Sequence, residues 1–391
     1  MFSPSLPAAE ELPAAGGPKG TREGAHPAIT FHLADDAALA FIGVASVVFS
    51  GRGQKIYALN ESAAYLACKL ERGASYSELL ADLVGNGADP ESAATALGGW
   101  LVAWSRAGIA GAEIARTPGR AWRRCSLCVG PASFSLLHQD PALLDAILPA
   151  FRHLVGGGGA GTIDYYLSAA DGLVFIARER GMAAIVRPEQ AAPTLKAMLV
   201  EDVLGAARDS IALHTACLIE RDAALLLGGP PGAGKSTLAL ALLGAGFGYG
   251  ADDVTLLDAR GRARGVPFAP TIKIGATRFF PGLEKLPVHR RLDGRRLRYW
   301  PMEPLPRRDW MPVRWLVRLR RRSGIAAELV PSEPMDALSG IMGEALTRSG
   351  QASVGDFHAL KDLVAGAECH ELHYSDLGDA VRLLTRLCRN D

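Results

Sequence analysis

The sequence predicts an α/β protein with more than one domain. Its 391 residues exceed the length of one ordinary domain, so two or three domains are expected. An apolar run at 223–227, a helical pattern at 235–243 and a second apolar run at 254–257 follow in the strand–helix–strand order of an α/β core. Apolar alternation and then helical periodicity in 45–107 predict a separate small module ahead of that core.

Composition and charge narrow the class of protein. Hydrophobic residues make up 49% and charged residues 21% of the chain, which is typical of soluble globular proteins. The net charge of +1 gives no overall attraction to nucleic acid or to an anionic membrane. The most apolar long stretch, 223–251, is interrupted by Pro230, Pro231 and Lys235, so no transmembrane helix is expected. Residues 1–26 lack the features of a secretory signal, and we expect a disordered tail on a cytoplasmic protein.

The first ordered block, 27–112, is expected to form a β-hairpin followed by three helices. Alternating apolar residues mark the hairpin strands at 45–49 and 55–59. The helical patterns lie at 61–70, 75–84 and 90–107. Asn60 stands where it can cap the first of these helices, because its side chain can accept a free backbone N–H at the helix start.

A smaller α+β segment, 120–210, is expected to belong with the half of the chain that follows it. Strands are predicted at 162–167 and 173–177. The stretch 186–209 is predicted to be largely helical after breaks at Pro188 and Pro193, because proline lacks the backbone N–H that a helix interior uses.

The last block, 211–391, carries the chemistry and ends in an amphipathic helical pattern at 376–388. Its segment GPPGAGKS, 229–236, fits the P-loop pattern G-x-x-x-x-G-K-[ST] at every fixed position. Glycines let several N–H groups turn toward one anion, the helix that follows adds its positive end, and the lysine reaches the phosphates. The expected nucleotide-binding residues are Gly229, Gly232, Ala233, Gly234, Lys235, Ser236 and Thr237.

Two adjacent carboxylates, Asp252 and Asp253, come shortly after the predicted P-loop helix, just before an apolar run. Beside a P-loop, acidic residues at a strand end commonly hold Mg²⁺ or activate the nucleophile. We expect Ser236 and Asp252 to bind Mg²⁺ and one aspartate to accept the acceptor's proton, and the residues leave open which one. The alternative is a polar turn without a chemical role. His214, ahead of the P-loop strand, is by itself more typical of a structural histidine.

From His214 onward the chain resembles the bacterial HPr serine kinase/phosphorylase superfamily, through LHTACLIERDAALLLGGPPGAGKSTLALALL and GFGYGADDVTLLD. The resemblance implies ATP and Mg²⁺ as cofactors, aspartates that bind the metal and activate an acceptor serine, and His214 supporting an aspartate. It also implies a phosphate role for Lys273 in PTIK, for which a surface lysine is the alternative. The glycine- and arginine-rich signature of true HPr kinases is absent from the sequence, so a kinase with a different acceptor is implied.

The block 27–112 resembles the PqqD-like peptide-recognition modules of ribosomal peptide biosynthesis, through YALNESAAYLACKLERGASYSELLADLV and LVAWSRAGI. The resemblance implies a winged-helix-like module that binds a leader peptide as an added strand. The alternative is a winged-helix-like structural domain. The two resemblances together imply a kinase for the serine of a ribosomally made precursor, such as a lasso peptide. A nucleotide-gated adaptor without catalysis stays open, as does an HPr-type carrier protein kinase, which predicts a homo-oligomer.

The stretch 289–322 contains twelve arginines and three acidic residues. Arginine interspersed with tryptophan can indicate nucleic-acid binding. However, 313–319 alternates apolar residues with arginine, which is typical of a half-buried strand with one solvated face. The sequence therefore favours a strand over a nucleic-acid site.

Overall fold

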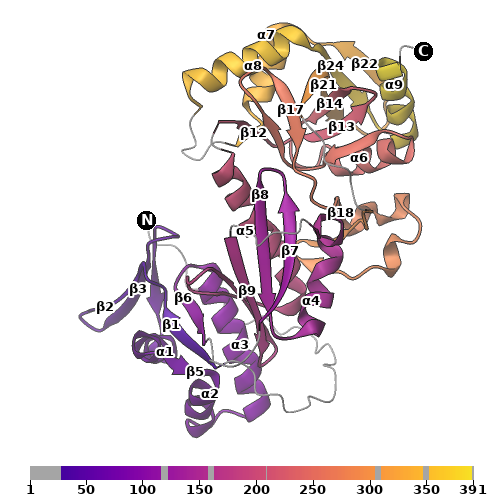
Figure 1. Cartoon of the computed structure of the whole chain (residues 1–391). Helices are drawn as coiled ribbons and strands as arrows, with labels where there is room; N and C mark the ends of the chain where they lie inside the picture. Colours follow the sequence, from indigo (N-terminus) through magenta and orange to yellow (C-terminus); the bar gives the residue numbers. More distant parts are fainter. Residues whose placement is uncertain are drawn as a thin grey trace. The chain divides into compact units, whose positions relative to one another are not determined.

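The computed structural model describes residues 28–115, 122–156, 163–207, 209–303, 310–346 and 352–389. The predicted tail, 1–26, lies outside these ranges. The protein is mixed α/β, as predicted, and the chain forms two compact units (Figure 1). Unit 1 comprises Met1–Cys125, Ser135–Ile147 and Ile163–Leu195, and unit 2 comprises Ser126–Phe134, Leu148–Thr162 and Lys196–Asp391. The predicted middle segment, 120–210, is divided between the two.

Unit 1 begins with two small antiparallel sheets. In the first, β1 (Ile29–Leu33) lies between β5 (Ala74–Ser75) and β6 (Ala110–Ile114). In the second, β3 (Ala45–Ser50) lies between β2 (Ala37–Ile42) and β4 (Lys55–Leu59). The predicted hairpin is therefore confirmed as β3–β4, and β2 extends it at one edge.

All three predicted helices of this block are confirmed. They are α1 (Glu61–Arg72), α2 (Tyr76–Gly85) and α3 (Pro90–Arg106). Asn60 caps α1 as expected, because its side-chain oxygen accepts the Ala63 N–H at 2.9 Å. Ser75 and Glu78 form a capping box at the start of α2, and Pro90 occupies the first turn of α3, where its missing N–H costs nothing.

A third, five-stranded sheet has the strand order β11–β10–β9–β8–β7. Its strands are β7 (Arg123–Val129), β8 (Ala132–His138), β9 (Ile163–Ala170), β10 (Leu173–Arg178) and β11 (Ala184–Val186), and α4 (Pro141–Ile147) follows β8. The predicted strands at 162–167 and 173–177 are confirmed as β9 and β10. Phe175 of β10 packs 5.8 Å from Phe31 of β1, so the core of unit 1 extends beyond residues 27–112.

The helix α5 (Pro188–Ala206) runs without interruption, so the predicted break at Pro193 is wrong. Pro193 lies near the start of the helix and removes a single backbone hydrogen bond there. The fully buried side chains of Leu195, Leu199 and Val203 supply packing that outweighs this loss.

Unit 2 is built on one large mixed sheet with the order β15–β13–β14–β21–β17–β16–β12–β23, and β24 and β22 continue beside β21. The strands are β12 (Ile211–Leu213), β13 (Ala216–Glu220), β14 (Ala223–Gly228), β15 (Gly248–Ala251), β16 (Thr255–Leu257), β17 (Arg262–Gly265), β21 (Met311–Arg321), β22 (Glu328–Pro331), β23 (Ala345–Leu346) and β24 (Glu368–Tyr374). A separate small sheet contains β18 (Thr271–Lys273), β19 (His289–Arg290) and β20 (Arg296–Tyr299).

Helices cover both faces of the large sheet (Figure 1). The helices α7 (Pro334–Met342) and α8 (Val354–Gly366) share a core with Leu226 and Leu316 on one face. The helices α6 (Lys235–Gly244) and α9 (Leu377–Arg389) share a core with Leu225 and Val317 on the other face. The predicted β14–α6 unit and the C-terminal helix are thus confirmed.

The strand predicted at 313–319 is confirmed within β21, and its arginine face is partly solvated, with Arg314 52% exposed and Arg318 half-buried. Trp315, Leu316 and Val317 are consecutive and at most 6% exposed. They are buried because β21 lies between the parallel neighbours β14 and β24, with helices on both faces. Among the described residues, no helix is long and apolar enough to cross a membrane.

Candidate active site

The predicted P-loop connects the end of β14 to the start of α6. Gly229, Gly232 and Gly234 have φ angles of 140°, 94° and 100°, which side chains other than glycine rarely adopt. A Cβ at Gly234 would also collide with the hydroxyl of Tyr374, which donates to the carbonyl of Ala233 at 2.6 Å. The loop conformation therefore depends on glycine and is supported from β24.

The start of α6 presents backbone donors toward the loop. Lys235, Ser236 and Thr237 form its first turn, where backbone N–H groups have no partner within the helix. This turn carries no acidic side chain, and Gly234 at the N-cap position provides no side-chain cap. The free N–H groups and the positive end of the helix favour a bound phosphate.

The side chain of Lys235 is 8% exposed and bends back onto the loop, where its ammonium donates to the carbonyl of Gly229. Glu344 adds an unexpected carboxylate at this point. Its Oε2 lies 3.7 Å from the Lys235 Nζ, and its Oε1 accepts the Gly229 N–H at 2.8 Å. Burial lowers the pKa of Lys235, although the negative charges of Glu344 and Asp253 oppose that shift.

Asp252 is a buried carboxylate, 2% exposed, directly after β15. Its Oδ2 accepts the backbone N–H of Thr271 at 3.0 Å, and its Oδ1 accepts the hydroxyl of Tyr249 at 3.3 Å. Burial raises the pKa of Asp252, and the neighbouring charge of Asp253 adds to this. The Lys196 ammonium and a hydrogen bond from the Ser236 side chain act in the opposite direction.

Asp253 is more accessible, with 42% of its side chain exposed. His214 Nδ1 lies 3.2 Å from Asp253 Oδ1 and 3.1 Å from the Asp253 carbonyl oxygen. Burial opposes ionisation of this carboxyl, but the His214 hydrogen bond and the Lys196 charge outweigh it and lower the pKa of Asp253. The two aspartates therefore differ in environment: one is enclosed and the other is an accessible, readily ionised carboxylate.

Lys196 of α5 is a second buried ammonium in the site, at 8% exposed. Its Nζ donates to Thr271 Oγ1 at 3.1 Å and lies 3.7 Å from Asp253 Oδ2. The rings of Phe268 and Tyr299 face it at 5.6 and 6.0 Å. No motif in the sequence marks this lysine, because it lies in a helix far ahead of the P-loop.

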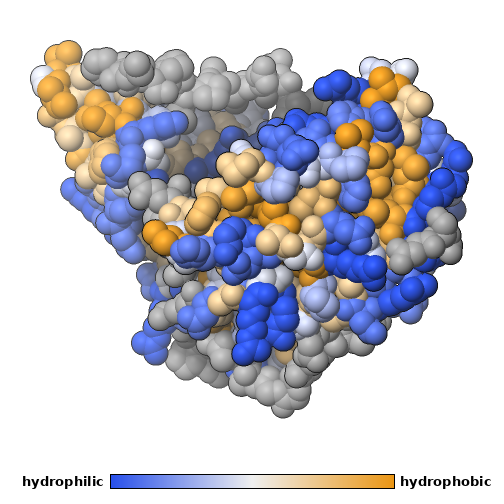
Figure 2. Space-filling model, turned by 90° about the horizontal axis from the view of Figure 1, so that it is seen from above, coloured by the Kyte–Doolittle hydropathy of each residue, from blue (hydrophilic) through white to orange (hydrophobic). Residues whose placement is uncertain are grey.

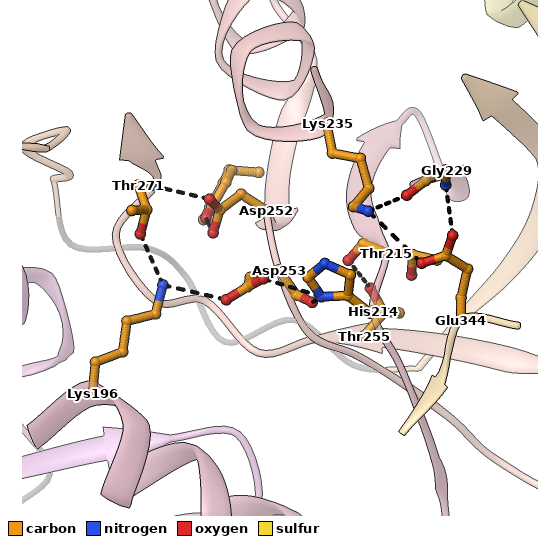
Figure 3. A network of polar contacts seen from close by, with 11 residues as sticks. Lys196, His214, Thr215, Gly229, Lys235, Asp252, Asp253, Thr255, Thr271 and Glu344 are labelled. Carbon is orange, nitrogen blue, oxygen red and sulfur yellow. Dashed lines mark hydrogen bonds and ion pairs between the residues drawn. The ribbon is translucent and has the colours of Figure 1, made fainter. Parts of the chain in front are cut away.

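Figure 3 shows these residues as two neighbouring groups of polar contacts. One joins Lys196 and Thr271 to the two aspartates and His214, and the other joins Glu344, Lys235 and Gly229. The backbone connects the two groups, because the His214 N–H donates to the Glu344 carbonyl at 2.7 Å. The carboxylates and the P-loop lysine thus belong to one site.

The last predicted residue, Lys273, lies at the end of β18 with an exposed side chain. Its positive charge is one of the influences that lower the pKa of Lys235, after the larger effect of burial. This places Lys273 within electrostatic reach of the phosphate loop. Both the phosphate role and the surface-lysine alternative remain open.

The oxygen ligands near the loop are typical of Mg²⁺ shared between the protein and substrate phosphates, and not of a metal ion bound by protein side chains alone. Among the described residues, no group of three or more His, Cys, Asp or Glu side chains could hold a metal ion. Ser236 and Asp252 supply a hydroxyl and a carboxylate that interact with each other. Mg²⁺ is commonly held by one or two such ligands together with substrate phosphates.

Comparison with known proteins adds no assignment to this geometry. No protein-family model matches the chain, and no curated protein matches its sequence. The residues that sequence reasoning missed, Lys196, Thr271 and Glu344, are found only through the contacts described above.

Proposed function

We propose that the chain is a Mg-ATP-dependent kinase that phosphorylates a serine hydroxyl on a peptide or protein. The observation that carries the proposal is the shared network of the P-loop lysine, Lys235, with Asp252, Asp253 and His214 (Figure 3). A phosphate-binding loop, a buried carboxylate for Mg²⁺ and an accessible carboxylate for the acceptor are the parts that phosphoryl transfer requires. The resemblance to HPr serine kinases, carried by the same residues, supports this proposal.

The two aspartates differ in ways that suggest separate roles. Asp252 is enclosed and interacts with Ser236, so we assign it to the metal. Bound Mg²⁺ would neutralise charge on the phosphate oxygens. Asp253 is accessible, so we assign it to the incoming hydroxyl, and its lowered pKa keeps the carboxylate ionised.

In the proposed reaction the loop N–H groups and Lys235 hold the phosphates, and Asp253 orients the acceptor serine. The serine oxygen forms a bond to the γ-phosphorus while the bond from that phosphorus to the β–γ bridging oxygen breaks. The serine proton passes to Asp253, and ADP leaves with the electron pair of the broken bond. His214 acts by holding the Asp253 carboxylate in place.

Unit 1 has a surface suited to peptide binding. The strands β2 and β4 are the edges of a three-stranded sheet, and Phe41, Ile42 and Val44 at the β2–β3 turn are 63%, 68% and 107% exposed. In Figure 2, apolar side chains gather at the left margin, where Figure 1 places this hairpin. An exposed strand edge with apolar side chains can take up an extended peptide. We propose that it binds the leader of a ribosomally made precursor, as the PqqD-like resemblance implies.

The proposal is tested by incubating the full chain with Mg-ATP and the precursor peptide encoded nearest its gene. Intact mass spectrometry should show a gain of one or more phosphates on the peptide. Lys235→Ala should abolish the gain, whereas Lys361→Ala, an exposed lysine of α8, should leave it unchanged.

Peptide capture with ATP binding but without any mass gain would contradict the kinase. That result would favour the nucleotide-gated adaptor. Phosphate transfer to a folded HPr-type carrier protein instead of the peptide would identify the other alternative, the carrier protein kinase.

A further inference from the structure

An open pocket of about 390 Å³ lies beside the P-loop, and neither aspartate, His214 nor Lys235 lines it. Its walls are the loop segment 230–233 and the segment 319–322 at the end of β21. We infer that this pocket holds the nucleoside part of the nucleotide, with the base stacked against an arginine guanidinium. The inference rests on the proposed function, because it takes the phosphates to occupy the P-loop.

The pocket is separate from the aspartates, because its lining includes neither Asp252 nor Asp253. Strand β14, which leads into the loop, pairs with β21. The pocket lies at the end of β21 beside the loop, whereas β17 pairs with the opposite end of that strand. A nucleotide with its phosphates on the loop and its transferred phosphate toward Asp253 could therefore place its nucleoside against the end of β21.

The loop and the end of β21 are in direct contact, so they form one surface. Gly228 pairs with Arg318, and the chain of β21 then continues past the loop. A Cβ placed on Gly229 would lie 3.0 Å from the Leu319 carbonyl oxygen. The pocket therefore adjoins the proposed phosphate site, so the phosphates and the nucleoside of one nucleotide could occupy the two sites together.

The pocket lining combines apolar surface with planar cations. Pro230, Pro231 and Leu319 provide the apolar part, and Arg321 and Arg322 are exposed at the strand end. Arginine guanidinium groups attract anions and also stack on planar rings, whereas a lysine ammonium attracts anions but has no planar group to stack. The volume lies within the range of about 300–1,000 Å³ that is usual for small-molecule sites. This mixture fits a base and ribose better than an acidic peptide, which would need few apolar contacts.

The arginines of segment 319–322 have different contacts. Arg320 is fixed by Glu371, whose Oε1 accepts two hydrogen bonds at 3.0 and 3.1 Å. Arg321 of β21 pairs with Tyr374 of β24, the residue whose hydroxyl supports the loop. Arg321 is thus on the loop side of the strand end, where a base could stack on it.

A binding experiment separates the nucleoside from the phosphates. We would titrate the full chain with Mg-ADP and with magnesium tripolyphosphate, which has phosphates but no nucleoside. Wild type should bind Mg-ADP at least about tenfold more tightly, since stacking one base contributes that much or more. The double variant Arg321→Lys and Arg322→Lys keeps the charge but removes the planar groups. It should lose about tenfold in Mg-ADP affinity and keep its tripolyphosphate affinity within about twofold.

Two further variants identify the part of the ligand affected. Arg382→Lys with Arg386→Lys, on exposed positions of α9, is the matched control and should change neither affinity. Lys235→Ala should weaken both ligands, since it removes the phosphate contact. Unchanged Mg-ADP affinity in the Arg321/Arg322 variant, with both ligands still dependent on Lys235, would overturn the pocket and leave the kinase proposal standing. Failure of wild type to bind either ligand would overturn both.

Photolabelling gives a test that needs no variant. Light-activated 8-azido-ADP, bound with Mg²⁺, should label peptides that contain 230–233 or 319–322, and excess ADP should prevent the labelling. Labelling confined to other peptides would place the nucleoside elsewhere and overturn the inference.

Discussion

The carboxylate of Glu344 lies 3.7 Å from the ammonium of Lys235 and also accepts the Gly229 N–H at 2.8 Å. An internal anion is thus held at the loop where we propose that phosphate oxygens bind. The contact is well enclosed, with 8% of the Lys235 side chain and 14% of the Glu344 side chain exposed. Lys235 would have to exchange Glu344 and the Gly229 carbonyl for phosphate oxygens when a nucleotide binds.

This exchange predicts that Glu344→Gln binds Mg-ADP more tightly than wild type, by about three- to tenfold. The amide oxygen can still accept the Gly229 N–H, but the negative charge that competes for Lys235 is gone. Calorimetric titration measures the change, and Glu333→Gln, an exposed residue before α7, is the control. Weaker binding in Glu344→Gln would show instead that the carboxylate assists the bound nucleotide.

The environments of the two aspartates predict different defects for their amide variants. Asp253→Asn should lower the single-turnover transfer rate by about a thousandfold or more while nearly preserving Mg-ADP affinity, because the proton acceptor is lost. Asp252→Asn should raise the Mg²⁺ concentration needed for half-maximal rate, because a metal ligand is lost. Asp222→Asn, an exposed position, serves as control. Transfer at the wild-type rate in Asp253→Asn would rule out its role as the base.

Lys196 should set the pH dependence of the reaction. Its positive charge lowers the pKa of Asp253 and opposes the burial effect on Asp252, so its removal should raise the pKa of both. Activity that requires ionised aspartates would then be lost at a higher pH as the solution is acidified. We expect the acid limb of kcat/KM to move upward in Lys196→Met and to move less in Lys196→Arg. Reduced activity with an unmoved acid limb would indicate a packing role only.

Burial of Asp252 predicts a stability gain on its neutralisation. Its pKa is raised in the folded state, so its stabilising contribution is complete below the ordinary aspartate pKa and is lost as the pH rises through the raised value. At neutral pH Asp252→Asn should therefore stabilise the protein, measured without added nucleotide, by on the order of 1 kcal/mol. Thermal unfolding at neutral and acidic pH checks this, and the gain should shrink in acid. A lower Tm at neutral pH would contradict it.

The exposed β2–β3 turn predicts a binding defect without a transfer defect. Ile42→Ser combined with Val44→Ser should weaken capture of the full precursor peptide by about tenfold, because apolar contact area is lost. Transfer to a peptide without its leader should stay unchanged. Fluorescence anisotropy of labelled leader measures the affinity. Met335→Ser on α7 is the control, because Met335 is an exposed apolar residue (74%) away from this turn. Equal leader affinity in the double variant would exclude this surface.

Local chemistry made several features predictable from the sequence. Asn60 caps α1 through an atom three residues away, and the glycines of 229–234 fix the loop through their own backbone angles. The P-loop motif and the two aspartates after it could also be predicted from the sequence, because they are recognised from residues that are close together in the chain. The three helices of residues 61–106 were predicted from side-chain periodicity alone.

Tertiary structure decided which residues far apart in the sequence come into contact. Pro193 does not break α5, because buried side chains on the same helix hold it. Leu316 is buried on the arginine face of β21 because strands and helices surround that part of the strand. Glu344 reaches the P-loop because β23 pairs with β12 and places it beside His214. Lys196 lies in α5, far earlier in the chain, and its ammonium is 3.7 Å from Asp253 Oδ2. The sequence determined the loop and the residue types for phosphate chemistry, whereas packing alone chose their partners, since charge and burial depend on neighbours that chain order does not specify.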